Sequence, residues 1–190
     1  MTSPPLKVLA ISGSLRKASY NTAALRAAQE LAPEGMTIEI ASIEDIPLYN
    51  HDVQEQGFPA PVTALADAIR AADALLIASP EYNYSTSGVL KNTIDWLSRI
   101  PNQPLAGKPV AMIGASMSLL GAARAQYHLR QMFVFLDALP INKPEVFIAQ
   151  AQNKFDAEGR LTDETTRGFV RTLLESLAAW TRRQKASAPS

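Results

Sequence analysis

The sequence predicts a doubly wound α/β domain, in which a parallel sheet carries helices on both faces. Strand-like and helix-like segments alternate along the chain, as parallel strands joined by crossover helices require. Several strand-like segments are nearly continuous apolar runs, such as Val8-Leu9-Ala10-Ile11, which is typical of strands buried on both faces. The 190 residues suffice for one domain with a full core, and we expect a single domain at 1–185 and a loose tail at 186–190.

Each expected element follows from the local pattern. Apolar runs or alternation predict strands at residues 6–12, 36–42, 74–79, 109–115 and 146–148. Helical spacing of apolar residues predicts helices at 21–31, 62–72, 88–100 and 122–138, and a last helix capped by Thr162. Ligands of such sheets lie beyond the carboxyl ends of the strands, so the loops after the first, third and fourth strands are the candidate sites.

Composition excludes several classes of function. Eighteen basic residues balance eighteen acidic ones, so we expect neither nucleic acid nor a membrane surface as a partner. The chain has no cysteine, which excludes disulfides, thiolate metal sites, Fe–S clusters and a cysteine nucleophile. The last exclusion removes phosphatases that use a phosphate loop with a catalytic cysteine. We find no signal-peptide pattern or membrane-length apolar run, and therefore expect a cytoplasmic protein.

The loop after the first strand has the residue types of an anion site. It joins a buried strand to a helix N-terminus, where free backbone N–H groups and the helix dipole favour negative charge. Gly13 permits a tight turn, and the loop also offers two hydroxyls, one guanidinium and an amide that can cap the helix, from Ser14, Ser19, Arg16 and Asn21. We expect a phosphate monoester here, although an ordinary polar loop with a capping Asn is the alternative.

Two other phosphate motifs are absent from this loop. It lacks the GK[ST] ending of a Walker A loop and with it the magnesium-binding hydroxyl. It also lacks the G-x-G-x-x-G fingerprint of dinucleotide-binding domains. Arg16 in a serine-rich loop directly after a strand is what favours the phosphate interpretation.

The loop after the third strand, residues 79–88, is rich in aromatic and amide side chains. Tyr82, Asn83 and Tyr84 provide flat surfaces and amide donors on which an aromatic ligand could lie. As a pattern alone, the segment is equally compatible with a simple turn.

These two loops together resemble the NADPH-dependent FMN reductase family, which includes bacterial chromate and quinone reductases and azoreductases. The resemblance rests on Gly13-Ser14-Leu15-Arg16 with Ser19 and Asn21, on Pro80-Glu81-Tyr82-Asn83, on Gly88-Val89-Leu90-Lys91-Asn92 and on Asp95-Trp96. It implies a flavodoxin-like fold with a five-stranded sheet in the order 2-1-3-4-5. It also implies a homodimer or homotetramer with the flavin near a subunit contact.

The resemblance also implies the roles of individual residues. FMN would be the cofactor, with its phosphate held by Ser14, Arg16, Ser19 and Asn21. Its isoalloxazine ring would lie against Pro80, Glu81, Tyr82 and Asn83, largely on their backbone groups.

In the family's reaction, NAD(P)H would reduce FMN by hydride transfer in a ping-pong cycle, and the electrons would pass to a quinone, chromate, azo compound or free flavin. The chemistry takes place on the flavin N5 atom, so no catalytic side chain is expected.

The loop after the fourth strand departs from the family's pattern. Relatives usually carry more glycine here, whereas this chain has Met117, Leu119 and Leu120, which could alter the substrate pocket or simply pack under the next helix. Ser116 is the expected flavin contact in this loop.

The remaining candidates favour structural roles. His51 and His128 are too isolated in the sequence for a metal site, and we expect no metal. Asp95 and Trp96 favour packing or a subunit contact over catalysis.

Three other functions stay open at this stage. A flavodoxin-like electron carrier would bind FMN without NAD(P)H turnover, but such carriers are typically acidic and this chain is neutral. A hydrolase or transferase of a phosphorylated substrate would leave the second motif unexplained. An ArsH-like organoarsenical reductase would use the same fold.

Overall fold

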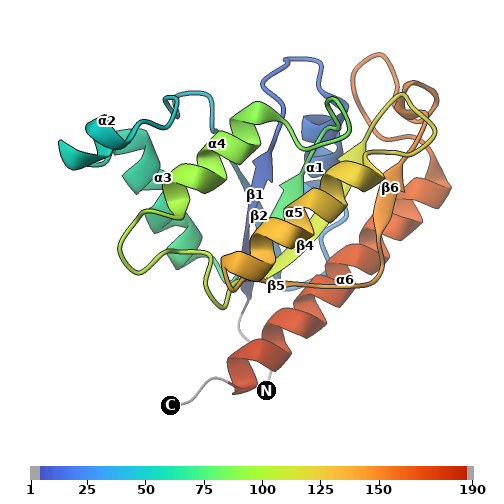
Figure 1. Ribbon diagram of the computed structural model, residues 1–190. Coiled ribbons are helices and arrows are strands. Elements are labelled where there is room, and N and C mark those ends of the chain that lie inside the picture. Colours follow the sequence, from blue (N-terminus) through green and yellow to red (C-terminus); the bar gives the residue numbers. More distant parts are fainter. Residues whose placement is uncertain (1–4, 188–190) are drawn as a thin grey trace.

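A six-stranded parallel sheet forms the centre of the molecule in the computed structural model, which describes residues 5–187 (Figure 1). The sheet order is β2-β1-β3-β4-β5, and β6 also pairs with β4. The strands are β1 (Leu6–Ser12), β2 (Met36–Ala41), β3 (Ala74–Ala78), β4 (Pro109–Ala115), β5 (Leu139–Pro140) and β6 (Val146–Ile148).

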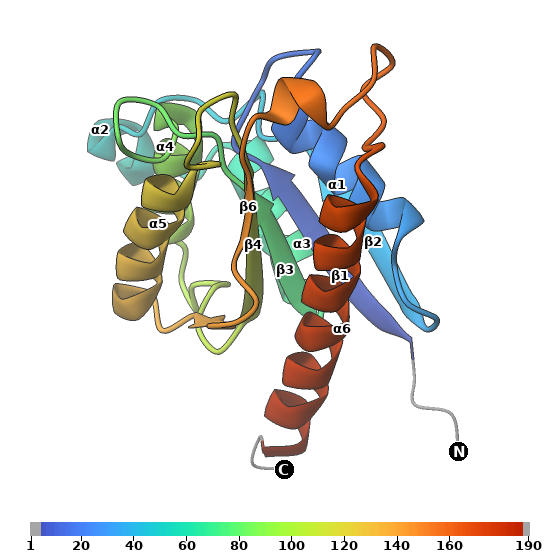
Figure 2. The same cartoon turned by 90° about the vertical axis from the view of Figure 1, so that its right-hand side faces the viewer.

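Helices cover both faces of this sheet, as Figure 2 shows edge-on. One face packs against α1 (Tyr20–Glu30) and α6 (Glu164–Ser187). The other packs against α3 (Ala60–Ala71), α4 (Gly88–Leu97) and α5 (Ala123–Phe135). The short α2 (His51–Glu55) and the 3-10 turn η1 (Ala151–Asn153) lie in connections. The doubly wound, flavodoxin-like architecture is therefore confirmed.

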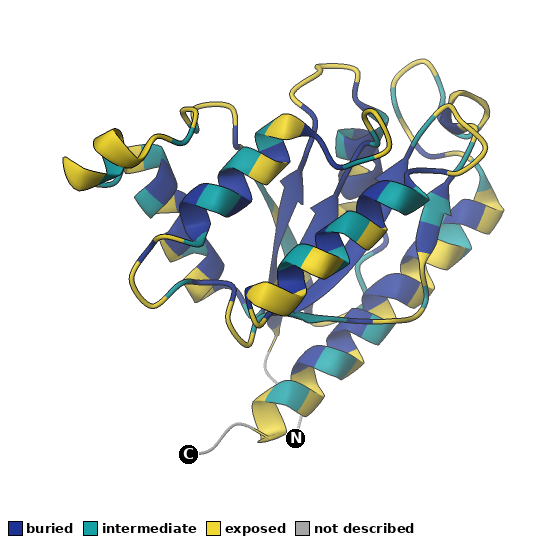
Figure 3. Ribbon diagram, viewed as in Figure 1, coloured by how far each residue is buried: buried dark blue, intermediate teal, exposed yellow. Residues whose placement is uncertain are grey.

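The alternation of side chains along each strand supplies both cores. In β1, Val8 and Ala10 belong to the core under α1 and α6, whereas Leu9 and Ile11 belong to the core under α3, α4 and α5. Both sets are buried, because successive side chains of a strand point to opposite faces. Figure 3 shows the result: the central strands β3 and β4 are buried along their whole length, and the helices that pack on the sheet expose their outer faces.

The sheet has the expected order with one strand more than the five expected, because two short strands share one position beside β4. β5 pairs with residues 109–110 of β4, and β6 pairs with residues 113–115. Between them the chain leaves the sheet through Pro144, which has no N–H to donate to a ladder. The sequence pattern of β5 is too short to be recognised as a strand.

Both ends of the last helix also differ from expectation. The N-cap is Asp163, whose Oδ1 accepts the backbone N–H of Thr166 at 2.8 Å, rather than Thr162. At the other end the helix continues through Ala186 and Ser187, and residues 188–190 of the expected tail lie outside the described residues.

No helix within residues 5–187 is long and apolar enough to cross a membrane.

Candidate functional site

Three loops meet where the strand order reverses. β1 and β3 are neighbours in the sheet, and so are β3 and β4. Their carboxyl ends lead into residues 13–19, 79–87 and 116–122, which lie together at the upper edge of the sheet in Figure 1. This is the place where doubly wound sheets bind ligands.

Gly13 allows two of these loops to touch. We name each loop after the strand that it follows, so the first loop is residues 13–19, the third loop is residues 79–87 and the fourth loop is residues 116–122. The N–H of Gly13 donates to the carbonyl of Ala78 at 2.7 Å, which continues the β1–β3 ladder into the first loop. A Cβ at this position would lie 3.1 Å from Pro80 Cδ, Ser87 Oγ and Leu90 Cδ2. A larger residue would therefore push the two loops apart.

The N-terminus of α1 presents hydroxyl donors to the same space. Ser19 is the N-cap, and its Oγ accepts the N–H of Thr22 at 3.3 Å, so its own O–H is free to donate elsewhere. Ser14 lines the site as well, and no hydrogen bond of its hydroxyl to another residue within 5–187 is formed. Both hydroxyls are thus available to an anion.

Asn21 is engaged with the backbone of β4. Its Nδ2 donates to the carbonyl of Ala115 at 3.0 Å, and its Oδ1 accepts the N–H of the same residue at 2.9 Å. Both groups are buried, so the side chain fixes α1 to the end of β4. One N–H of the amide remains for a ligand.

Arg16 is the positively charged residue of the first loop that lines the site. The residue is exposed, lines the site and forms no ion pair with another residue of the described part of the chain. An unpaired guanidinium beside free hydroxyls and a helix N-terminus is well suited to a phosphate dianion.

The loop after β3 contains a tight turn with an unusual backbone. Tyr82 and Ser85 exchange two backbone hydrogen bonds, of 2.9 and 3.0 Å. The two residues between them, Asn83 and Tyr84, have φ of 48° and 69°. Positive φ at two consecutive residues is the geometry of a type I′ turn, in which glycine is normally preferred at the second position.

Glu81 joins this loop to α5. Its carboxylate forms an ion pair with the guanidinium of Arg124 and accepts the backbone N–H of Arg124 at 3.1 Å. The hydrogen bond from the Arg124 side chain raises the pKa of that arginine above its ordinary value. The Glu81 side chain is only 6% exposed, so the pair is shielded from water on the carboxylate side.

The loop after β4 closes the site on the third side. Ser116 and Met117 line it. Met117, Leu119 and Leu120 are all exposed. They therefore do not pack under the helix that follows the loop, which was one of the two interpretations of these residues. The loop ends at Gly121, where a Cβ would lie 2.7 Å from the carbonyl carbon of Phe147.

Together the loops enclose a cavity of about 210 Å³. Eight of the nine expected site residues line it, and the exception is Asn83, in the turn. Three further residues line it: Met117, which the sequence indicated only as a residue that could alter the pocket, and Tyr20 and Ala115, which sequence reasoning missed. Tyr20 and Ala115 directly precede the predicted contacts Asn21 and Ser116. Including the residues that flank each motif would have found both.

Comparison with known proteins identifies the family. The model of the NADPH-dependent FMN reductase family matches residues 6–153, which include all three loops. The chain belongs to this family. An NAD(P)H-dependent FMN reductase of Pseudomonas aeruginosa is 60% identical over 181 residues, covering 95% of this chain and 98% of that protein. A quinone reductase of Escherichia coli is 50% identical over 186 residues, covering 96% and 99%.

A solved structure supports the same family. The flavoenzyme NAD(P)H:(acceptor) oxidoreductase FerB of Paracoccus denitrificans superposes with a TM-score of 0.85 at 35% identity, covering 94% of this chain and 98% of that one. The chain is thus an oxidoreductase of the NADPH-dependent FMN reductase family.

The donor set of the family's site fits FMN. The residues of the first loop and of the start of α1 that line the cavity offer neutral O–H and N–H donors and one cation, Arg16, which are the groups that a phosphate monoester needs without a metal ion. Within residues 5–187 no group of three or more acidic or histidine side chains could hold a metal ion. The third loop adds backbone groups and the half-exposed ring of Tyr82.

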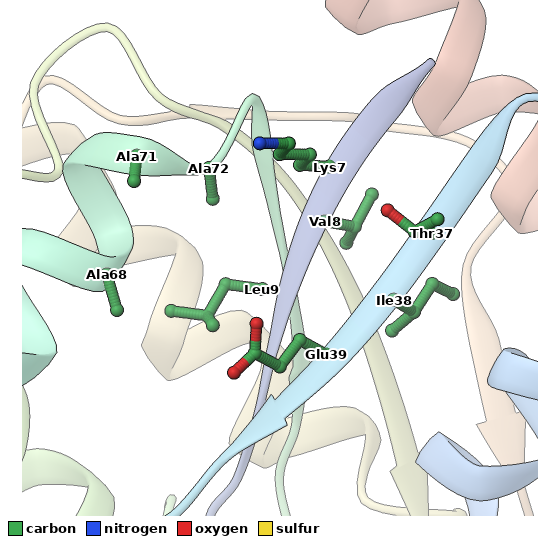
Figure 4. Close-up of a pocket in the computed structure, with 9 residues that line it drawn as sticks. All are labelled: Lys7, Val8, Leu9, Thr37, Ile38, Glu39, Ala68, Ala71 and Ala72. Carbon is green, nitrogen blue, oxygen red and sulfur yellow. The ribbon is translucent and has the colours of Figure 1, made fainter.

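A second hollow lies away from the family's loops. It has a volume of about 360 Å³ and lies between α3 and the first halves of β1 and β2. In Figure 4 the side chains of Leu9, Glu39 and Lys7 point toward the space beside α3. None of the expected site residues lines it, so we assign it no role in the reaction.

The residues weighed for structural roles have clear partners. The Trp96 side chain is fully buried, and its Nε1 donates to the carbonyl of Pro47 at 2.8 Å. Asp95 pairs with Lys91 at 2.6 Å on the surface of α4. His128 Nδ1 lies 2.9 Å from Ser85 Oγ, so this histidine contacts the turn of the third loop.

Proposed function

We propose that this protein, as one domain of residues 1–185, binds FMN and oxidises NAD(P)H, passing the electrons to a quinone. The observation that carries the proposal is the cavity shared by the first and third loops, which joins an anion site to a surface for a flat ring. Neither half alone would specify a flavin.

The first loop would hold the phosphate end of the cofactor. Arg16 supplies the only guanidinium lining this cavity among the described residues, and the free O–H groups of Ser14 and Ser19 add neutral donors. Asn21 contributes at most one N–H, because its other polar groups are bound to Ala115. Its main role would be to keep α1 and β4 in register around the site.

The third and fourth loops would hold the ring end. Pro80, Glu81 and Tyr82 line one side of the cavity, and Ser116 and Met117 line another. Backbone N–H groups of these loops would stabilise negative charge on the reduced ring. The Glu81 carboxylate is bound to Arg124, so Glu81 offers only its backbone to the cofactor.

The protein's task in the reaction would be binding and orientation, since no pair of side chains in the site is arranged as an acid and a base. When bound, FMN would supply the redox chemistry, accepting a hydride from NAD(P)H and passing two electrons to the acceptor. Two substrates that use one site in turn give ping-pong kinetics, so double-reciprocal plots at several quinone concentrations should be parallel. Chromate, azo compounds and free flavin are further proposed acceptors.

An absorbance spectrum of the purified protein tests the proposal. We expect a yellow protein, or one that becomes yellow when FMN is added, whose visible absorbance bleaches with NADPH under anaerobic conditions and returns when a quinone is added. A colourless protein that takes up no FMN would refute the proposal. Bound FMN that NADPH and NADH fail to bleach would indicate an electron carrier instead.

We also propose a homodimer or homotetramer in the cytoplasm, where NAD(P)H is available. Two large apolar residues at the end of α5, Val134 and Phe135, are 83% and 87% exposed. Such exposed side chains on one helix end favour a contact with a second copy. Light scattering of the purified protein should give two or four times the chain mass of 20.6 kDa.

A further inference from the structure

The carboxylate of Glu81 binds the start of a helix that lies 43 residues further along the chain. It accepts the backbone N–H of Arg124 at 3.1 Å and that of Ala125 at 3.4 Å, in the first turn of α5. It also pairs with the Arg124 guanidinium. One buried side chain of the third loop therefore makes both backbone and side-chain bonds to α5.

The start of α5 has no cap of its own. Its N-cap residue, Ala122, offers no side-chain acceptor and has φ of 68°, and the first turn contains no acidic residue. The first N–H groups of a helix need acceptors, and the positive end of its dipole favours a negative charge nearby. Glu81 meets both needs from outside the helix.

Arg124 in turn supports the turn of the third loop. Its guanidinium lies over the ring of Tyr84, 3.5 Å from the centroid. Tyr84 is the residue at φ 69°, a conformation that side chains other than glycine rarely adopt. Such a backbone persists only where its surroundings hold it, and the stacked guanidinium is one such contact.

A second contact fastens the same turn one helical turn further along α5. Ser85 Oγ lies 2.9 Å from Nδ1 of His128, four residues after Arg124. The third loop is therefore attached to α5 on both sides of its positive-φ residues, by Glu81 before them and by Ser85 after them.

We propose that Glu81 is a positioning residue, which fixes the backbone of residues 80–83 against α5 in the conformation that receives the flavin ring. This proposal rests on the proposed function, because it assumes that the third loop meets the ring. We call the bonds of Glu81 to Arg124 and Ala125 the Glu81 clamp. The clamp acts on the ring end of the cofactor and leaves the phosphate end to the first loop.

The test compares FMN with riboflavin, which has the same ring and no phosphate. In Glu81→Ala we expect the dissociation constants of both flavins to rise by the same factor, about tenfold if the loop is correctly folded a tenth of the time. In Glu81→Gln, which keeps an acceptor for the helix N–H groups, the rise should be smaller. In Arg16→Ala only FMN binding should weaken, because riboflavin makes no phosphate contact.

Visible circular dichroism of the bound flavin gives a readout that a loss of stability alone would not move. We expect the band of the ring to change in Glu81→Ala and to remain in Asp67→Ala, which breaks an exposed ion pair with Arg70 on α3. In the double variant Glu81→Ala/Arg124→Met, flavin binding should weaken by less than the sum of the losses in Glu81→Ala and Arg124→Met, because the two residues belong to one network.

The outcomes separate this proposal from the proposed function. A wild-type protein that binds neither flavin overturns both. A wild-type protein that binds FMN, with Glu81 variants whose flavin affinity and visible circular dichroism are unchanged while only their unfolding temperature falls, overturns the clamp alone. Weakened FMN binding with unchanged riboflavin binding in Glu81→Ala also overturns it.

Discussion

At the scale of single residues, the site separates side chains that can bind a ligand from side chains that hold the site together. Ser14, Ser19 and Arg16 have donor capacity that no described residue uses. By contrast, the side chain of Asn21 is hydrogen-bonded to the backbone of β4, and that of Glu81 to the backbone of α5. A motif written as a list of letters does not distinguish these two roles, because both kinds of residue line the same cavity.

Arg16 should be required for FMN affinity before it is required for turnover. Loss of a charge-assisted hydrogen bond to phosphate costs about 1.5–3 kcal/mol, so Arg16→Ala should raise the FMN dissociation constant roughly ten- to hundredfold. Fluorescence titration of the apoprotein measures this. Arg26→Ala, an exposed cation of α1 that does not line the cavity, is the matched control. Undiminished flavin binding with lost turnover would contradict the assignment.

Asn21 should matter more for stability than for binding. Asn21→Ala leaves the buried N–H and C=O of Ala115 without partners, which costs about 1–3 kcal/mol of unfolding free energy. Urea denaturation of the apoprotein checks this without any cofactor. The exposed Asn142, which makes only a 3.4 Å contact with Arg130, is the control, and Asn142→Ala should change stability little. A stable Asn21→Ala variant with much weakened FMN binding would show that the amide binds phosphate instead.

At the scale of elements, apolar patterning predicted the strands better than the helix ends. β1 and β4 have the predicted bounds, because their buried runs are flanked by polar or turn residues. β5 was missed, since a two-residue strand has no pattern of its own and depends on its partner β4. The N-cap of α6 was misplaced by one residue, because both Thr162 and Asp163 are good caps by type and only the fold decides between them.

The candidate site was predictable as far as its residue types and loop positions. Eight of the nine expected residues share the cavity because parallel strands place their carboxyl ends on one edge. The pairing of Glu81 with Arg124 was not predictable. It depends on the distance between a loop and a helix start that lie 43 residues apart, and no local pattern reports that distance.

Two glycines in different elements should respond in opposite ways to alanine. At Gly121, with φ 55°, a Cβ would lie 2.7–2.9 Å from backbone atoms of residues 147–149, so Gly121→Ala should destabilise the fold by about 1–3 kcal/mol. At Gly168, within α6, a Cβ meets nothing within 4 Å, so Gly168→Ala should stabilise it by roughly 0.5–1 kcal/mol. Thermal and urea unfolding compare the two. Equal effects at both sites would contradict the packing described for the loop after β4.

At the scale of the whole molecule, one carboxylate ties the first strand to the last helix. Asp73 precedes β3, accepts the N–H of Lys7 at 2.7 Å and pairs with Lys185 near the end of α6. These contacts lie at the opposite ends of the strands from the site loops, so they can stabilise the fold without shaping the cavity. Trp180 adds a further bond, from its Nε1 to the carbonyl of Leu139 at 2.9 Å.

The contribution of Asp73 to stability should depend on pH in a defined direction. Burial raises the pKa of Asp73, but the hydrogen bonds from Lys185 and from the Lys7 N–H outweigh it, so the pKa lies below its ordinary value. A lowered carboxyl pKa contributes stability above the unfolded-state pKa of about 4, and that contribution is lost as the pH falls through the folded-state value. Lys108 also faces this carboxylate, and its positive charge contributes to the lowered pKa of Asp73.

We therefore expect Asp73→Asn to be less stable than the wild type by about 1 kcal/mol at neutral pH, with the difference shrinking below pH of about 4. Urea unfolding at several pH values measures it. Asp67→Asn, which breaks the exposed pair with Arg70, should show a difference near zero throughout. The contrary result would be a difference for Asp73→Asn that grew on acidification. It would mean that the carboxyl is protonated more readily in the folded protein than in the unfolded chain. The ion pair of Asp73 would then not hold the first strand to the last helix.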